Sequence, residues 1–423
     1  MLLNQYVYEL LASCCVRWID FVRLGATCQH YHRLMVRSSR WKQLNLGGCH
    51  WLTDKLLFHL TKVLDGYIRQ GFQTPFVESL TLDGCYQLSN RVMDYISRCY
   101  VLSNIAHLSL DNCQITSIKD FFGRHVSTLA PPTNQASEGP EDPPQPMPRG
   151  PLLSLRIPTL QANQTTPILS HLSSLTSLTL PGSVDHYMML RFIESSPRLE
   201  RLRIESRNKD NLFNTLIIEK LCQLRSLQDI HLMAMTAMTG ENVGMLAMNL
   251  VNIKRISITN NSQLTGDFVN VVLDSCKSLV ELNIRYCRNV GDVSMRNTSL
   301  QVLDASHTIT SANLDLPNLR TLLLNSWGLG DNDHCHQLFS RHPLLRHLDL
   351  TNCNVNDDQL SIILSYCQNI QTLNLDRCPI TRTSINHIFD NCKDLFKIVL
   401  SNTVIAKHPE QANKLLELKY TPS

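Results

Sequence analysis

The chain has 423 residues and a formal net charge of +3 at pH 7. This near balance gives no bulk electrostatic reason to expect binding to nucleic acid or to an anionic membrane surface. No run of about 18 apolar residues occurs and no basic start precedes an apolar run, so we expect neither a membrane span nor a secretory signal.

The first 41 residues predict a small helical module. Val7, Leu10 and Leu11 recur at helical spacing, and Asp20 opens a second apolar pattern as an N-cap or first-turn acid. A module of this size rarely folds alone, and it directly precedes a series of repeats. One interpretation is therefore a helical cap that covers the first repeat.

The pattern that organises the rest of the chain is clearest in residues 276–292, CKSLVELNIRYCRNVGD. Leu279, Leu282, Ile284 and Cys287 have the spacing L-x-x-L-x-L-x-x-C, and residues 281–285 alternate between polar and apolar side chains. Such alternation predicts a short strand with one buried face. The cysteine, which is small and weakly polar, is expected at a tight buried corner.

One such strand cannot bury its apolar face alone, and copies of it occur on both sides. The clearest copies end at Cys49, Cys85, Cys113, Cys353 and Cys378. From Leu178 onward, neighbouring centres are 24, 28, 26, 26, 21, 19, 26, 25 and 25 residues apart. The centres that give these intervals are Leu178, Leu202, Ile230, Ile256, Leu282, Leu303, Leu322, Leu348, Leu373 and Ile398.

A period in the twenties with this consensus is typical of the leucine-rich repeat. A second cysteine at the helix end, as at Cys276, Cys367 and Cys392, resembles the cysteine-containing subclass. We therefore predict an α/β fold, a leucine-rich-repeat solenoid with a curved parallel sheet and outer helices. It would span residues 42–423 with about 14 repeats. The 15 cysteines are then read as buried thiols of a reducing compartment, so we expect a cytoplasmic protein, with the nucleus as a second compartment.

The repeats are interrupted at residues 130–151, where eight of the 18 prolines fall within 131–151. Proline at this density cannot build a helix or a ladder, so we expect a disordered, solvated loop. Its simpler interpretation is a tolerated insertion; the alternative is a tether or flap across the concave face.

No catalytic constellation stands out. The chain has no G-x-x-x-x-G-K-[ST], H-E-x-x-H or G-x-S-x-G motif. His334, Cys335 and His336 are adjacent but lack a partner pair at ligand spacing, so a solvated helix or loop is expected there. We predict no enzyme activity, no metal and no cofactor.

The remaining candidate for function is the concave face, lined by the residues between the buried leucines. These include a basic middle and an acidic far end, which favours a complementary polypeptide. The alternative is that Glu205, Asp229 and Glu281 neutralise the arginines locally. Tyr286 and Trp327 follow strand ends and could supply aromatic anchors. The predicted substrate-binding residues are Arg201, Arg203, His231, Arg255, Arg285, Asp349 and Asp376.

The first 41 residues also resemble an F-box. The family's spacing is matched by Leu3, Val7, Leu11, Ser13, Asp20-Phe21, Cys28, Tyr31, Leu34 and Trp41, with departures at Asn4, Tyr6 and Ala12. This resemblance implies a substrate receptor of an SCF-type ubiquitin ligase. Its partners would be the SCF adaptor, through it the cullin and RING subunits, and a protein substrate. The implied adaptor-binding residues are Leu3, Val7, Leu10, Leu11, Phe21 and Leu24.

Two alternatives stay open. One is a leucine-rich-repeat interaction scaffold with no link to ubiquitin. The other is an enzyme regulator resembling the Ran GTPase activators, which have longer, cysteine-poor repeats. Binding to the ligase adaptor distinguishes the first interpretation from both.

Overall fold

A computed structural model of the chain describes residues 39–69, 76–122, 151–157, 169–181, 184–205, 215–235, 238–291, 293–308 and 312–400. The chain divides into two compact units, Met1–Leu199 and Glu200–Ser423. The predicted helical module up to residue 38 lies outside the described residues, as does the Pro-rich segment up to residue 150. The predicted boundary between residues 41 and 42 therefore stays a prediction.

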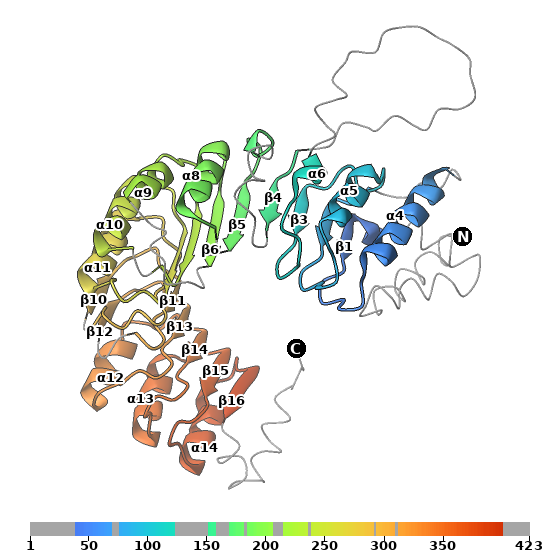
Figure 1. The fold of residues 1–423 in the computed structure, drawn as a ribbon. Helices are drawn as coiled ribbons and strands as arrows, with labels where there is room; N and C mark the ends of the chain where they lie inside the picture. Colours follow the sequence, from blue (N-terminus) through green and yellow to red (C-terminus); the bar gives the residue numbers. More distant parts are fainter. Residues whose placement is uncertain are drawn as a thin grey trace, which may run out of the picture. The chain divides into compact units, whose positions relative to one another are not determined.

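In the first unit, short strands pair in parallel in chain order, and described helices follow β1, β2, β3 and β5. Figure 1 shows the helices of this unit on one side of its strands. The described elements are η1 (Ser39–Lys42), β1 (Gln43–Asn45), α4 (Asp54–Arg69), β2 (Ser79–Thr81), α5 (Arg91–Arg98), β3 (His107–Ser109), α6 (Lys119–Phe122), β4 (Ser154–Arg156), β5 (Ser177–Pro181) and α8 (His186–Ser195).

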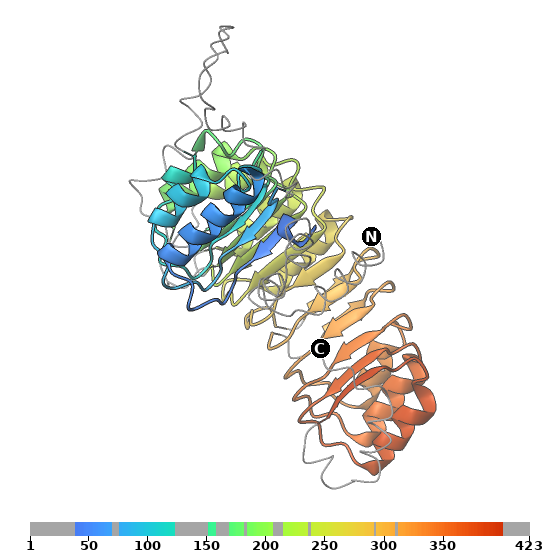
Figure 2. The ribbon, with the colours of Figure 1, turned by 90° about the vertical axis from the view of Figure 1, so that its right-hand side faces the viewer.

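The second unit repeats this arrangement. Figure 2 shows helices along one face of the strands in its last repeats, drawn in orange to red. The elements are β6 (Arg201–Glu205), α9 (Thr215–Cys222), β7 (Asp229–Met233), α10 (Gly240–Asn249), β8 (Arg255–Thr259), α11 (Gly266–Ser275), β9 (Glu281–Asn283), β10 (Val293–Arg296), β11 (Val302–Asp304), β12 (Ala312–Asp315), β13 (Thr321–Leu323), α12 (Asn332–Phe339), β14 (His347–Asp349), α13 (Asp357–Tyr366), β15 (Thr372–Leu375), α14 (Arg382–Asn391) and β16 (Lys397–Leu400).

The predicted repeat centres are register partners in the parallel ladders, which confirms the leucine-rich-repeat fold. In the first unit the row is Leu44, Leu80, Leu108, Leu155 and Leu178. In the second unit it is Leu202, Ile230, Ile256, Leu282, Leu303, Leu322, Leu348, Leu373 and Ile398. Almost all of these side chains are buried, and their burial supplies most of the stability of such an array.

Several helices of the second unit begin and end at residues that cap them. Thr239 is the N-cap of α10 and Asn356 is the N-cap of α13. In each, the cap side chain accepts from the backbone N–H three residues on, and the side chain of that residue accepts from the cap N–H, which forms a capping box. The helix-end cysteines Cys276, Cys367 and Cys392 are the C-cap residues of α11, α13 and α14 and are buried. The sequence pattern therefore located both the strands and the helix ends.

The corner cysteines tie neighbouring repeats together. Cys287 Sγ donates to Ile258 O at 3.0 Å, and Cys353 Sγ donates to Leu324 O at 3.1 Å, each in the preceding repeat. Thr308 stands at the same corner and donates its hydroxyl to Ile284 O at 2.6 Å. Burial raises the pKa of both cysteines to about 11, so the thiols stay protonated and remain donors at neutral pH.

The two shortest repeats depart from the expected outer helices. Between β9 and β13 the outer layer consists of strands β10 and β12, which pair in parallel with each other. Val293 and Met295 of β10 face inward while Ser294 and Arg296 are exposed. Repeats of 21 and 19 residues leave too little chain for a helix and its two connections, so an extended segment covers the core instead.

Candidate functional site

The side chains opposite the helices of the second unit form a surface that we call the open strand face. It is composed of the outward residues of β6 to β9, β11 and β13 to β16 and corresponds to the predicted concave face. In β6, Arg201 and Arg203 are exposed while Leu202 and Ile204 between them are buried. Because residues two apart in a strand share a face, the open strand face is polar while the opposite face packs into the core.

Two of the predicted arginines are paired with acids on this face. Arg203 Nε lies 2.5 Å from Glu205 Oε1, two residues on in the same strand. Arg255 contacts both carboxylate oxygens of Asp229 at 2.6 and 2.7 Å, across the β7–β8 ladder. The arginine side chains are 49% and 53% exposed, so each pair contributes at most about 1 kcal/mol to stability. Local neutralisation thus accounts for two of the four arginines.

The other two arginines have no acidic partner within the described residues. Arg201 is exposed at the β6 edge of the face, in register with Asp229. Arg285 follows β9, and its guanidinium carbon lies 5.0 Å from the centroid of the Tyr286 ring, with Nη2 3.4 Å from the Tyr286 hydroxyl. Arg285 therefore presents a positive charge that the surrounding described chain leaves unneutralised.

His231 lies between Arg203 and Ser257 in the ladder register. Burial, together with the nearby Arg203 charge, lowers the pKa of His231, and Glu205 only partly opposes this. The ring is therefore neutral at pH 7 and adds no positive charge. Its Nε2 and the Ser257 hydroxyl are buried polar atoms without a hydrogen-bond partner among the described residues.

The acidic side chains at the far end of the open strand face are partly engaged in hydrogen bonds within the fold. Asp349 Oδ1 accepts from Thr351 N at 3.0 Å and from Thr351 Oγ1 at 2.6 Å, and Oδ2 accepts from Asn374 Nδ2 at 3.3 Å. The Asn325 amide, in its donating orientation, adds two further contacts to this carboxylate. Asp376 is half-buried, and its Oδ2 lies 3.7 Å from Arg377 Nε. Asp376 is therefore the freer of the two predicted acids.

Trp327 and Tyr286, both predicted as aromatic anchors, differ in their exposure. Trp327 is 2% exposed because it occupies the corner where other repeats place cysteine, so its prediction as a rim anchor was wrong. Tyr286 is 38% exposed and stacks on His307, with ring centroids 4.5 Å apart and planes 5° apart. His307 was missed, although its position one residue before Thr308 matches that of Tyr286 before Cys287.

The other predicted residues lie outside the open strand face or outside the described residues. The implied adaptor-binding residues Leu3, Val7, Leu10, Leu11, Phe21 and Leu24 lie outside the described residues. His334, Cys335 and His336 belong to α12, and Cys335 is buried. Within the described ranges, no group of three or more His, Cys, Asp or Glu could hold a metal ion, and no helix has the length and apolarity to cross a bilayer.

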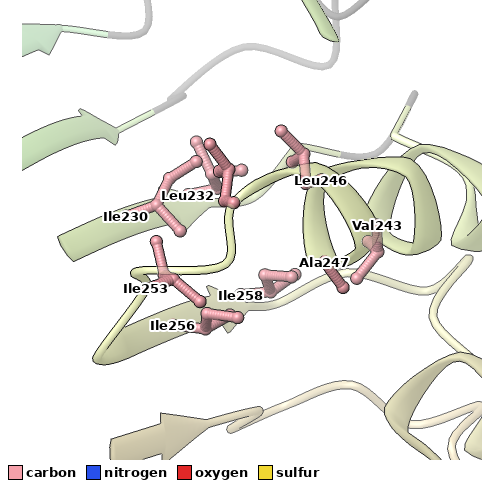
Figure 3. Close-up of a pocket in the computed structure, with 9 residues that line it drawn as sticks. Ile230, Leu232, Val243, Leu246, Ala247, Ile253, Ile256 and Ile258 are labelled. Atoms are coloured by element: carbon pink, nitrogen blue, oxygen red, sulfur yellow. The ribbon is translucent and has the colours of Figure 1, made fainter. Parts of the chain in front are cut away.

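An internal void lies between β7, α10 and β8. Figure 3 shows Ile230, Leu232, Val243 and Ile256 among the side chains around it. All nine lining residues are apolar, so the void belongs to the hydrophobic core and offers no group that could orient a polar ligand.

Comparisons with known proteins agree with this class of repeat. A family model described as the leucine-rich repeats of the FBD-associated F-box protein At5g56370 matches residues 303–416. The F-box protein SKIP19 of Arabidopsis thaliana is 29% identical over 163 residues, which cover 38% of this chain and 46% of that protein. The chain thus spans about half the length of this curated relative.

Among solved structures, an internalin of Listeria monocytogenes is 14% identical, with a TM-score of 0.44 over 84% of this chain and 92% of that chain. The complex of Rad7 and Elc1 in yeast is 13% identical, with a TM-score of 0.40 over 85% of this chain and 81% of that chain. The fold and its corner cysteines define a leucine-rich-repeat protein. In sequence, its C-terminal repeats are similar to those of F-box proteins that carry leucine-rich repeats.

Proposed function

We propose that this chain is the substrate-recognition subunit of an SCF-type ubiquitin ligase. The observation that carries the proposal is the row of cysteine-cornered repeats, whose C-terminal part matches the repeats of an F-box protein. The N-terminal 41 residues supply the second support, because their spacing resembles an F-box.

In this proposal the two ends of the chain have separate tasks. Leu3, Val7, Leu10, Leu11, Phe21 and Leu24 bind the ligase adaptor through apolar contacts. The open strand face binds the target protein through Arg201, Arg203, His231, Arg255, Arg285, Asp349 and Asp376. The chain performs no chemistry itself; it holds the target near a separate conjugating enzyme, where proximity and orientation raise the transfer rate.

The arginines without an acidic partner are expected to contribute most to target binding. Arg203 and Arg255 already spend part of their hydrogen-bonding capacity on Glu205 and Asp229. Arg201 and Arg285 have no acidic partner among the described residues, and the Arg285 guanidinium donates only to the Tyr286 hydroxyl. A charge-assisted contact from either to a target would add affinity and on-rate. Changing Arg201 and Arg285 to Glu should therefore weaken target capture without unfolding the repeats.

The test of the adaptor-binding half is a pull-down with the purified ligase adaptor. The intact chain should retain the adaptor, and a Leu10→Asp, Leu11→Asp double variant should lose it because charge in an apolar interface is not compensated. Adaptor binding that survives removal of residues 1–41 would reject this half of the proposal. The chain would then be an interaction scaffold unrelated to ubiquitin.

A further inference from the structure

At each corner that the structure describes, one residue lies in the left-handed region of backbone conformation, immediately before the cysteine position. At most of these corners its N–H donates to a carbonyl of the next repeat, as from Asn260 N to Arg285 O at 2.9 Å and from Asn352 N to Asp376 O at 2.8 Å. Glycine and asparagine adopt this conformation most readily. Five of the described corners follow that preference, with Gly48, Gly84, Asn112, Asn260 and Asn352. Five do not, with Ala234, Tyr286, His307, Ser326 and Arg377.

Tyr286 and His307 occupy two neighbouring corners against that preference, with φ of 62° and 57°. The fold uses their backbones in the ordinary way, since Tyr286 N donates to Ser306 O at 3.0 Å and His307 N to Asn325 O at 2.9 Å. Their rings do not fill the core, because Tyr286 is 38% exposed and His307 is half-buried. The needs of the corner therefore do not explain why a tyrosine and a histidine stand here.

The two rings and Arg285 form one cluster at the rim of the open strand face, which we call the rim cluster. Tyr286 stacks on His307 at 4.5 Å, and the Arg285 guanidinium lies over the tyrosine ring at 5.0 Å. Arg285 Nε is buried without a hydrogen-bond partner, and no carboxylate among the described residues pairs with this guanidinium. A fixed, planar cation beside an exposed aromatic ring is the kind of surface that dominates protein–protein affinity.

We infer that the rim cluster is the anchoring contact for the target protein and that it binds an acidic side chain. The guanidinium fork of Arg285 supplies donors for two anionic oxygens, and Tyr286 and His307 hold the fork in place and cover the neighbouring apolar part of the target. The anionic group is a carboxylate or a phosphate, which share this chemistry. The inference rests on the target-binding half of the proposed function and does not involve the adaptor.

The experiment uses the full chain, immobilised, and pools of nine-residue peptides that are degenerate except for the central position. Separate pools carry Glu, phosphoserine, Gln or Ser there. The wild-type chain should retain the Glu pool or the phosphoserine pool about tenfold more than its uncharged counterpart, and added salt should reduce this excess. A preference for phosphoserine over Glu identifies a phosphorylated target, and equal retention identifies an unmodified acidic one.

Arg285→Gln and Tyr286→Asn should each remove most of that excess. Tyr286→Asn is the sharper variant, because asparagine suits the corner conformation and so should leave the melting temperature within about 3 °C of wild type. Tyr187→Ala, which removes a 62% exposed tyrosine from α8, is the matched control and should retain the peptides fully.

Equal retention of charged and uncharged pools would overturn the inference, and so would full retention by Tyr286→Asn. A large loss of melting temperature in Tyr286→Asn would also overturn it, since the tyrosine would then serve the fold. The adaptor pull-down reads the other half of the proposed function separately, so failure of the peptide experiment and failure of adaptor binding are distinguishable.

Discussion

The corner thiols should stabilise the solenoid only where a preceding repeat offers them a carbonyl. Cys353 is fully buried and its Sγ donates to Leu324 O at 3.1 Å. In Cys353→Ala this bond is lost, one carbonyl loses a partner and a sulfur-sized void remains. A net hydrogen bond is worth about 1 kcal/mol and the deleted buried atom about as much again, so the free energy of unfolding should fall by about 1–2 kcal/mol.

The measurement is urea unfolding at pH 7 under reducing conditions, with Cys49→Ala as the matched control. Cys49 occupies the same corner of the first described repeat, is only half-buried, and no preceding strand lies within the described residues to accept from its thiol. Its substitution should cost less than about 0.5 kcal/mol. Cys353→Ser should retain part of the lost stability, because Thr308 shows that a hydroxyl can donate at this corner. Equal stability losses at Cys49 and Cys353, or none at Cys353, would refute the reasoning.

Three further expectations concern stability. Burial lowers the pKa of His342 from its ordinary value of 6.5, so the unfolded chain takes up a proton first as the pH falls. The free energy of unfolding should therefore be greatest above about pH 6.5 and decline below it. His342→Asn should flatten this decline in denaturant titrations between about pH 7 and 5. Hydrogen bonds from Ser384 and Thr381 outweigh burial and lower the pKa of Asp357, so its contribution is present above the unfolded pKa near 3.8 and is lost as pH falls through the folded value. Asp357→Asn should therefore lower stability at pH 7 by about 1 kcal/mol, measured by thermal melting, and should remove this acid dependence. Gly266→Ala places a Cβ 2.9 Å from Val290 O, so melting should show a loss of about 1–3 kcal/mol; an unchanged melting temperature would mean that the backbone shifts freely there.

The strands could be predicted because their signal is local. Period-two alternation around Leu282 and its register partners is written within five residues, and a one-residue slip would expose every leucine. The exposure of Trp327 was misjudged because aromatic side chains near strand ends were read one by one. Trp327 occupies the position in its repeat that Cys287 and Cys353 occupy in theirs, and this alignment indicated that it would be buried.

The replacement of outer helices by the strands β10 and β12 was also indicated by the sequence, through the lengths of these repeats. The intervals of 21 and 19 residues around Leu303 are too short for two connections and a helix. What the sequence could not supply was the pairing on the open strand face. The Arg203–Glu205 contact follows from strand periodicity, but the Asp229–Arg255 contact and the Tyr286–His307 stack depend on rotamers that only the assembled ladder fixes.

The modular architecture makes these tests interpretable. In a solenoid each repeat contacts only its neighbours, so stability is approximately a sum of repeat and interface terms. A change at the Cys353 corner should therefore weaken the C-terminal repeats without altering the surface around Tyr286. Conversely, a substitution in the rim cluster that abolishes capture of acidic peptides while leaving the unfolding transition intact can only have acted at the surface. Tyr286, directly before the buried cysteine of its corner, separates the two effects. The fold constrains its backbone, while its side chain is exposed and available for binding.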